Sequence, residues 1–262
     1  MNISVCIKQV PDTTEIRLDP KTNTLIREGV PSIINPDDKA AIEAALRLKE
    51  QTGASVTVIC MGPPQADVAL REALAMGCDE AVHISGREFS GSDTYATAAI
   101  LAAGLKKIGF DLILSGRQAI DGDTAQVGPQ LSEQLSIPQV SYALEITPEE
   151  DALLVKRQFE DQHHIIRAGW PCLITIMSEY AKPRYMTVKG IEDAYKAEIR
   201  TLSFDDLKDL LNPDWIGLDG SPTKVVKSFT KQAKGDGTKL RDLSTDEAVK
   251  AIVDKLDELQ II

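Results

Sequence analysis

Short apolar runs alternate with amphipathic segments along the first half of the chain. Runs rich in Val, Ile and Leu occur at 3–8, 55–60, 81–84 and 111–115, and a helix-like pattern separates each run from the next. Parallel strands that are buried on both faces are continuously apolar, and a helix usually connects them. The predicted fold class is therefore α/β, with a doubly wound and mostly parallel sheet.

Capping residues predict where the helices of this half begin. Asn35 suits an N-cap, Pro36 suits the first turn, and the carboxylates of Asp37 and Asp38 complement the positive end of a helix dipole. The apolar positions of this first helix share one face: Ala41, Ile42, Ala45 and Leu46. Three more helices are expected, from Pro63 and Pro64 to a cap at Gly77, from a cap at Ser92 and Asp93 to about Lys107, and from Thr124 to about Leu135.

The pattern changes after Pro138. The segments Val140–Ile146, Leu153–Phe159 and Cys172–Met177 are strand-like, and a turn is expected at 148–151. We expect these segments to be antiparallel strands added to the same sheet.

The end of the chain predicts a flexible tether and a helical arm. The polar segment Lys231–Asp242 contains glycines and follows a short helix expected near Ser203–Leu211. Ser244 and Glu247 have capping-box spacing, and an apolar stripe follows on one helix face. The stripe consists of Val249, Ile252, Val253, Leu256 and Leu259. We therefore expect a domain at 1–230 and a C-terminal tether and helix at 231–262, with the stripe packed on its own domain or on a partner subunit.

Composition limits the classes of partner. With 262 residues, of which 43% are apolar, the chain can bury a sizeable core. Its formal charge of −11 argues against nucleic acid or an anionic membrane as the principal partner, because both require clustered Lys and Arg. The start lacks the features of a signal peptide, and no apolar stretch approaches the roughly 18 residues that span a bilayer. A cytoplasmic location is expected.

The cysteines and histidines do not suggest a metal site. The cysteines are far apart and lie mostly in or beside apolar runs, so buried reduced thiols are expected rather than ligands or nucleophiles. They are Cys6, Cys60, Cys78 and Cys172. His163 and His164 are adjacent and would face opposite sides of a strand, so they cannot chelate one metal ion.

The best candidate for a binding site is Ser115–Pro129, which follows an apolar run and opens a helical pattern. Open parallel sheets bind ligands at the carboxyl ends of their strands, and a helix N-terminus offers free N–H groups to a phosphate. Asp121 and Asp123 would repel an anion, so we expect them to cap the helix or to bind ribose hydroxyls. The stretch has neither the dinucleotide nor the P-loop fingerprint, and by spacing alone a plain strand–loop–helix connection is equally consistent.

Five separated motifs lie along the chain, at Val5–Asp12, Asn35–Asp38, Met61–Pro64, Gly116–Pro129 and Pro183–Met186. Together they resemble the β subunit of electron transfer flavoproteins over essentially the whole chain. The resemblance implies an adenine-nucleotide alpha hydrolase-like fold, a larger α subunit that holds the electron-carrying FAD, and an adenine nucleotide buried in this chain's α/β domain. Within the family signature at Val155–Thr175, Gln162 and His164 depart from the expected residue types.

The resemblance also implies which residues surround the nucleotide, and it implies no catalytic or metal-binding side chain. Asp121 would bind ribose or a backbone amide, and Gln126, Val127 and Gly128 would face the pyrophosphate. The implied cofactor-binding residues are Cys6, Asn35, Asp37, Asp38, Met61, Thr94, Thr97, Arg117, Gln118, Ala119, Ile120, Asp121, Gly122, Asp123, Thr124, Ala125, Gln126, Val127 and Gly128.

Two details resemble the electron-bifurcating members of the family, in which the β subunit holds a second FAD that accepts a hydride from NADH. One is the loop from Asp121 to Gly128, and the other is Asp93 with Thr94 and Thr97 at the expected third helix. A glycine at 122 removes bulk and charge beside the ligand, which is consistent with room for a larger dinucleotide. The implied cofactors are FAD and NAD, and the alternative is a structural AMP in place of the β-site FAD in a non-bifurcating subunit.

The partners implied by the resemblance are the α subunit, ferredoxin and a flavin-dependent dehydrogenase of the acyl-CoA or lactate type. Tyr185, Met186, Val188 and Ile191 occupy the family's recognition loop for the dehydrogenase, with Val188 as the apolar anchor. Two other classes stay open. One is a non-redox adenine-nucleotide sensor, and the other is a nucleotide hydrolase, which would need a Ser-Gly-Gly phosphate loop where this chain has Gln9–Asp12.

Overall fold

The computed structural model describes residues 1–12, 31–226, 237 and 239–262. The chain divides into two compact units, Met1–Val226 and Lys227–Ile262, which are described separately. The expected tether at Lys231–Asp242 and the expected boundary after residue 230 lie largely outside the described residues.

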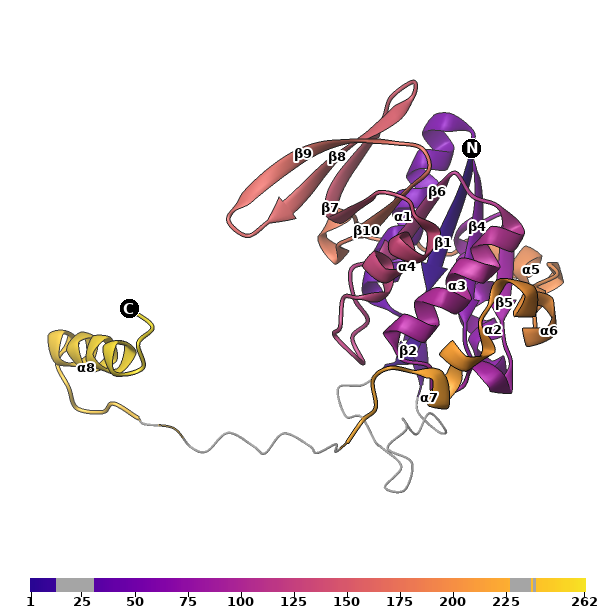
Figure 1. Cartoon of the computed structure of the whole chain (residues 1–262). Helices are drawn as coiled ribbons and strands as arrows, with labels where there is room; N and C mark the ends of the chain where they lie inside the picture. The colour runs from indigo at the N-terminus through magenta and orange to yellow at the C-terminus, as the bar shows by residue number, and fades with distance from the viewer. Residues whose placement is uncertain (13–30, 227–236, 238) are drawn as a thin grey trace. The chain divides into compact units, whose positions relative to one another are not determined.

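A nine-stranded sheet forms the centre of the first unit (Figure 1). From one edge to the other, its strands are β11 (Arg200–Leu202), β5 (Glu80–Ile84), β4 (Ser55–Met61), β1 (Asn2–Ile7), β6 (Leu112–Gly116), β10 (Cys172–Ile176), β7 (Gln139–Pro148), β8 (Ala152–Phe159) and β9 (Gln162–Gly169). All neighbours from β11 to β7 are parallel, whereas β8 and β9 are added antiparallel. A separate antiparallel pair joins β2 (Gln9–Pro11) to β3 (Ser32–Ile34). The mostly parallel α/β sheet with added antiparallel strands confirms the predicted fold class.

Helices cover both faces of the sheet. On one face α1 (Pro36–Thr52) and α2 (Asp67–Met76) pack against strand residues such as Val58 and Leu114. On the other face α3 (Thr94–Ile108) and α4 (Val127–Leu135) pack against residues such as Ile59 and Ile113. Consecutive strand residues therefore enter opposite cores, as the continuously apolar runs predict.

Short elements complete the first unit. The helices are α5 (Val188–Lys196), α6 (Phe204–Leu207) and α7 (Gly217–Gly220). The 3₁₀ turns are η1 (Pro64–Ala66), η2 (Arg87–Phe89), η3 (Ser178–Tyr180), η4 (Lys208–Leu210) and η5 (Pro213–Trp215). Gly77 ends α2 and Asp93 caps α3, as predicted, while Ser92 instead donates to the carbonyl of Phe89.

The sequence predictions for the direction of β7 and β10 and for the start of α4 are wrong. The segments Val140–Ile146 and Cys172–Met177 are not antiparallel additions, because β10 lies between β6 and β7 and runs parallel to both, and β7 is antiparallel only to β8. All five residues of β10 are buried, which is typical of a central parallel strand. Helix α4 begins at Val127 rather than Thr124, because Asp123 (φ 49°) and Ala125 (φ 53°) have left-handed backbones that a right-handed helix excludes.

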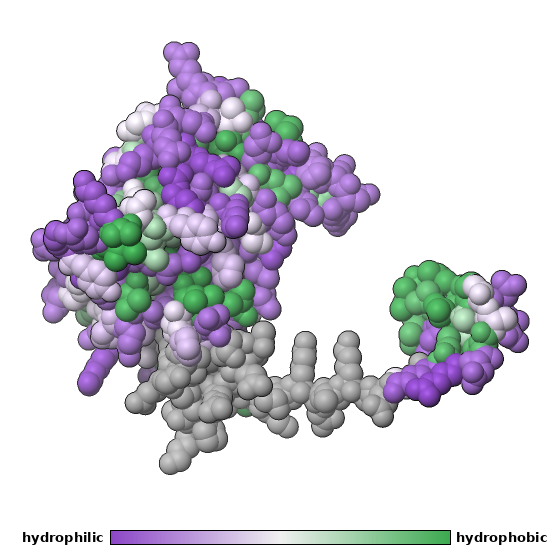
Figure 2. All heavy atoms as spheres, turned by 180° about the vertical axis from the view of Figure 1, so that it is seen from behind, coloured by the Kyte–Doolittle hydropathy of each residue, from purple (hydrophilic) through white to green (hydrophobic). Residues whose placement is uncertain are grey.

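In the second unit, α8 (Thr245–Glu258) begins with the predicted capping box between Ser244 and Glu247. No residue of this helix is buried, and its apolar residues form a visible hydrophobic face (Figure 2). Val249, Ile252, Val253 and Leu259 of the predicted stripe are all exposed.

Among the helices that the structure describes, none has the length and apolar character that crossing a bilayer requires.

Candidate functional site

A cavity of about 1050 Å³ opens at the carboxyl ends of β1, β4, β5 and β6. Its wall is built from the segments that follow those strands, with further residues from α3 and the start of α4. Ligand pockets typically have volumes of roughly 300–1,000 Å³. The cavity is therefore at the upper end of the range and lies where an open parallel sheet is expected to bind a ligand.

Most of the cofactor-binding residues implied by the sequence line this cavity. They are Cys6, Asp38, Met61, Thr94, Thr97, Arg117, Gln118, Ala119, Gly122, Thr124, Ala125, Gln126, Val127 and Gly128. The remaining ones lie outside the cavity wall: Asn35, Asp37, Ile120, Asp121 and Asp123. The structure thus separates the implied set into residues that line the cavity and residues that do not.

Asp38 connects the carboxyl ends of β1 and β6 at the cavity wall. Its Oδ2 accepts the backbone N–H of Lys8 at 2.8 Å, and its Oδ1 accepts the backbone N–H of Gly116 at 2.9 Å. An added Cβ at Gly116 would lie 2.3 Å from Asp38 Oδ1, so only glycine allows this approach. Burial raises the pKa of Asp38 to about 7, although the hydrogen bonds from Lys8, Asn35 and Gly116 oppose the shift.

Asn35 occupies the N-cap position of α1, as predicted, but its side chain makes no cap hydrogen bond. Its Oδ1 instead accepts the backbone N–H of Ile120 at 3.1 Å, and its Nδ2 donates to the carbonyl of Gln118 at 2.8 Å. Asn side chains readily bond to nearby backbone groups, and the loop after β6 presents both a donor and an acceptor here. Asn35 therefore stabilises the loop without lining the cavity.

Asp121 and Asp123 do not cap α4, contrary to the prediction. Asp121 Oδ1 lies 2.6 Å from Lys8 Nζ, and Asp123 Oδ1 accepts from Gln118 Nε2 at 3.0 Å. The N-cap residue of α4 is Gln126, which makes no side-chain cap hydrogen bond. Ribose binding by Asp121 stays a prediction, since the structure assigns its carboxylate to Lys8.

Several groups at the cavity suit an anionic ligand. Lys8, Arg87 and Arg117 contribute three cationic side chains to the wall. Ser115 is only 7% exposed, and its Oγ is a buried group without a hydrogen-bond partner in the described part of the chain. Buried polar groups are normally hydrogen-bonded, so an orphaned hydroxyl at a cavity wall fits a ligand that completes its bonding.

The first turn of α4 approaches the sheet closely at this point. An added Cβ at Gly128 would lie 2.7 Å from Thr175 Cγ2 and 3.1 Å from Ser115 Oγ. The N–H groups of a first helical turn have no intrahelical acceptor, and the helix dipole makes them favourable for a phosphate. The chemistry of these donors fits the pyrophosphate of a nucleotide.

Arg117 also pairs with Asp37. Arg117 Nε lies 3.5 Å from Asp37 Oδ2, an ion pair without a hydrogen bond. Burial raises the pKa of Asp37, while the charge of Arg117 acts in the opposite direction. Asp37, which does not line the cavity, thus offsets part of the Arg117 charge.

Sequence reasoning missed most of one wall of the cavity. This wall follows β5 and leads to Asp93, which the sequence did single out; the missed residues are Ser85, Gly86, Arg87, Phe89, Ser90, Gly91 and Ser92. The run Ser-Gly-Arg-Glu-Phe-Ser-Gly-Ser is rich in turn residues and comes directly after a predicted parallel strand, so the same rule that singled out the loop after β6 could have found it.

All four cysteines are buried and none forms a disulfide, as predicted. Burial is the largest cause that raises the pKa of Cys6, and the charge of Asp38 and the neighbouring Cys60 add to it. Burial likewise raises the pKa of Cys78 to about 12 and of Cys172 to about 11. The thiols at these positions are therefore protonated at neutral pH and unsuited to nucleophilic chemistry.

A second surface of interest lies on and before α5. Tyr185 and Val188 are 85% and 87% exposed, and Met186 and Ile191 are also exposed. We call these four residues the α5 patch. Thr187 caps the helix by accepting the N–H of Gly190 at 2.9 Å. The structure therefore brings together the residues implied to contact a partner, on a surface away from the cavity lining.

Comparisons with known proteins agree with this architecture. Residues 22–207 match the model of the electron transfer flavoprotein domain. The chain is 53% identical to the electron transfer flavoprotein subunit beta of Thermoanaerobacterium thermosaccharolyticum, with 100% of each chain covered. It is 51% identical to the caffeyl-CoA reductase-Etf complex subunit CarD of Acetobacterium woodii and 51% identical to the acryloyl-CoA reductase electron transfer subunit gamma of Anaerotignum propionicum, again with 100% of each chain covered.

Proposed function

The chain belongs to the electron transfer flavoprotein family, as a β subunit, and we propose that with a larger α subunit it forms an electron-bifurcating flavoprotein. In this proposal the cavity binds FAD. The observation that carries it is the cavity of about 1050 Å³ at the carboxyl ends of the parallel strands, whose wall brings together cationic side chains, the unpartnered Ser115 hydroxyl and the first turn of α4. The open space around Gly122 supports the same conclusion, since an added Cβ would meet no atom within 4 Å.

FAD held by these residues would supply the redox chemistry: it would take two electrons as a hydride from NADH and pass one toward ferredoxin and the other, through the α-subunit FAD, toward a dehydrogenase. Arg87 compensates charge of the pyrophosphate, while Lys8 and Arg117 neutralise the neighbouring carboxylates of Asp121 and Asp37. The Ser115 hydroxyl and the first turn of α4 donate hydrogen bonds to the pyrophosphate. Phe89 and other apolar lining residues exclude water from one side of the cavity. No side chain of this chain needs to act as an acid, a base or a nucleophile.

The partners follow from two exposed apolar surfaces. The relatives from the caffeyl-CoA and acryloyl-CoA reductase systems support a flavoenzyme acting on a CoA ester as the dehydrogenase. It binds the α5 patch, with the highly exposed Val188 as its apolar anchor. The α subunit covers the exposed stripe of α8, because a helix with one apolar face is stabilised when that face is buried.

The first test is the cofactor content of the heterodimer. The chain is purified with its co-expressed α subunit, the complex is denatured, and the released FAD and AMP are quantified by chromatography. Two FAD and no AMP per heterodimer is the expected result, and NADH-driven ferredoxin reduction should then depend on the CoA-ester acceptor. One FAD with one AMP would instead identify a simple electron carrier with a structural nucleotide. A complex without flavin would favour a non-redox nucleotide sensor.

A further inference from the structure

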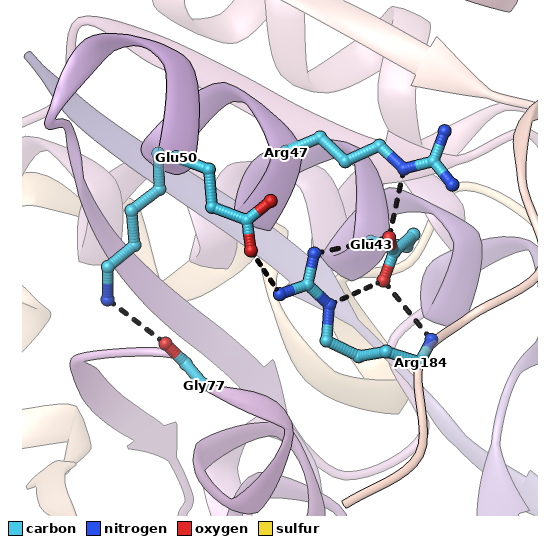
Figure 3. A network of polar contacts seen from close by, with 6 residues as sticks. Glu43, Arg47, Glu50, Gly77 and Arg184 are labelled. Atoms are coloured by element: carbon cyan, nitrogen blue, oxygen red, sulfur yellow. Dashed lines mark hydrogen bonds and ion pairs between the residues drawn. The ribbon is translucent and has the colours of Figure 1, made fainter.

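The segment that leads into α5 is held by one buried carboxylate. Residues 181–187 have no helix or strand, yet Arg184 in their midst makes three hydrogen bonds to Glu43 of α1 (Figure 3). Glu43 Oε2 accepts the backbone N–H of Arg184 at 3.1 Å and Nε at 2.8 Å, and Oε1 accepts Nη2 at 3.2 Å. Because a main-chain group is included, Glu43 fixes the path of the backbone as well as the side chain.

The surrounding contacts complete this arrangement. Arg184 Nη1 donates to Glu50 Oε1 at 2.6 Å, and Arg47 Nε donates to Glu43 Oε1 at 2.9 Å. Glu43 is 4% exposed, and its burial opposes ionisation, but the hydrogen bonds from Arg184 and Arg47 lower its pKa overall. An Arg fork on a carboxylate is both strong and directional, and Lys cannot reproduce its geometry.

The rest of α5 has its own attachment to α2. An added Cβ at Gly190 would lie 2.4 Å from the carbonyl oxygen of Ala75, which shows how closely the two helices approach. Arg71 Nη1 donates to the carbonyl of Ala194 at 2.7 Å near the end of α5. Tyr185 and Met186 lie before the helix. The contacts between α5 and α2 therefore do not hold these two residues in place, whereas the hydrogen bonds between Arg184 and Glu43 do.

We infer that Glu43 and Arg184 form a positioning pair that sets the conformation of Tyr185 and Met186 for binding of the partner dehydrogenase. This inference rests on the proposed docking role of the α5 patch. Helix α1 carries Asp38 of the cavity wall in its first turn and Glu43 five residues later. The partner surface is thus attached to the same rigid helix that forms part of the nucleotide cavity.

The inference is tested in the intact α–β complex with Arg184→Lys and Glu43→Gln. Reduction of a purified acyl-CoA dehydrogenase-type flavoenzyme by the NADH-reduced complex is measured as a function of dehydrogenase concentration. We expect KM to rise about tenfold, which corresponds to about 1.4 kcal/mol of binding free energy, with kcat and bound FAD unchanged within twofold. Hydrogen exchange should become faster at 182–188 and stay unchanged at 115–128.

Two further variants make the outcomes distinct. Arg47→Gln removes a neighbouring bond to the same carboxylate without touching the 181–187 segment, so its KM should stay within twofold of the unmodified complex. Val188→Glu tests the docking surface directly. If Val188→Glu raises KM but Arg184→Lys changes neither KM nor exchange, the positioning inference alone is wrong.

If Val188→Glu has no effect on KM, the docking role fails instead, and hydrogen exchange still reports whether the pair orders the segment. A loss of FAD or a general rise in exchange across the whole chain would identify the pair as a general structural element and overturn its positioning role. An equal KM increase in Arg47→Gln would do the same.

Discussion

Replacing Gly128 by Ala tests whether the first turn of α4 must lie against the sheet for the nucleotide to bind. The added methyl would be 2.7 Å from Thr175 Cγ2, whereas carbon atoms in contact are about 3.5–4.0 Å apart, so the overlap is roughly 0.8 Å or more. Overpacking of this kind typically costs about 1–3 kcal/mol, of which the better helix propensity of Ala recovers at most about 1 kcal/mol. We expect α4 to shift outward and FAD affinity in the β cavity to fall by up to about thirtyfold, which corresponds to the remaining cost of about 2 kcal/mol.

A matched variant makes this prediction specific. Thr175→Ser removes only the methyl group that meets the new Cβ and retains the hydroxyl, which accepts the backbone N–H of Tyr142 at 2.9 Å. In a double-mutant cycle, Thr175→Ser should restore most of the FAD affinity and thermal stability that Gly128→Ala loses. The assay is titration of FAD into the complex depleted of flavin, together with thermal unfolding. Strictly additive effects in the double variant would refute the packing argument.

Four other outcomes are expected. Gly122→Glu adds bulk and charge to open cavity space and should exchange FAD for AMP in the purified heterodimer, whereas Gly122→Ala should retain FAD, as chromatography of released nucleotides will show. Burial raises the pKa of Asp38 from 3.8 to about 7, so its contribution to stability is present below about pH 4 and is lost as the pH rises through 7. Asp38→Asn should therefore flatten the decrease in urea midpoint between pH 5 and 8, and an unchanged pH profile would contradict the assignment. Val188→Glu should raise KM for the dehydrogenase at least tenfold without changing ferredoxin reduction measured with a saturating acceptor. Ile252→Lys on α8 should lower the affinity for the α subunit by about tenfold in sedimentation experiments, while Lys250→Ala leaves it unchanged.

The fold could be predicted from the sequence wherever the signal is local. The four apolar runs, the Gly77 cap and the capping box at Ser244 each depend on residues a few positions apart, and each was found. The direction of β10 could not be predicted locally. After β7 the chain first forms the antiparallel strands β8 and β9 and then returns to place β10 between β6 and β7. The five consecutive buried residues of β10 were nevertheless the available sign of a central strand.

The same difference between local and long-range signals holds for the candidate site. Residues after β6 were singled out because loop and helix adjoin in the sequence, and most of them line the cavity. The bonds that shape the loop join positions that are 83 to 113 residues apart, from Asn35 to Gln118 and from Lys8 to Asp121. A side-chain cap hydrogen bond was a reasonable local role for Asn35, Asp121 and Asp123. It was wrong because distant partners compete for the same side chains, and no spacing rule within one segment includes them.

These long-range partners also show why a formal charge of −11 does not argue against the anionic ligand that we propose for the cavity. The carboxylate of Asp121 is paired with Lys8, and that of Asp37 with Arg117. Burial raises the pKa of Asp38 to about 7, so close to neutral pH a large fraction of this carboxyl carries no charge. These three acidic groups are thus compensated or partly protonated. At Asp93, which also lines the cavity, burial raises the pKa but hydrogen bonds from Thr223 and Ala96 lower it overall, so this carboxylate is charged. Arg87, the Ser115 hydroxyl and the first turn of α4 are available at the wall. Local pairing rather than net charge determines the sign of the field that a ligand meets, because charges more than a Debye length of about 8 Å away are largely screened at the surface.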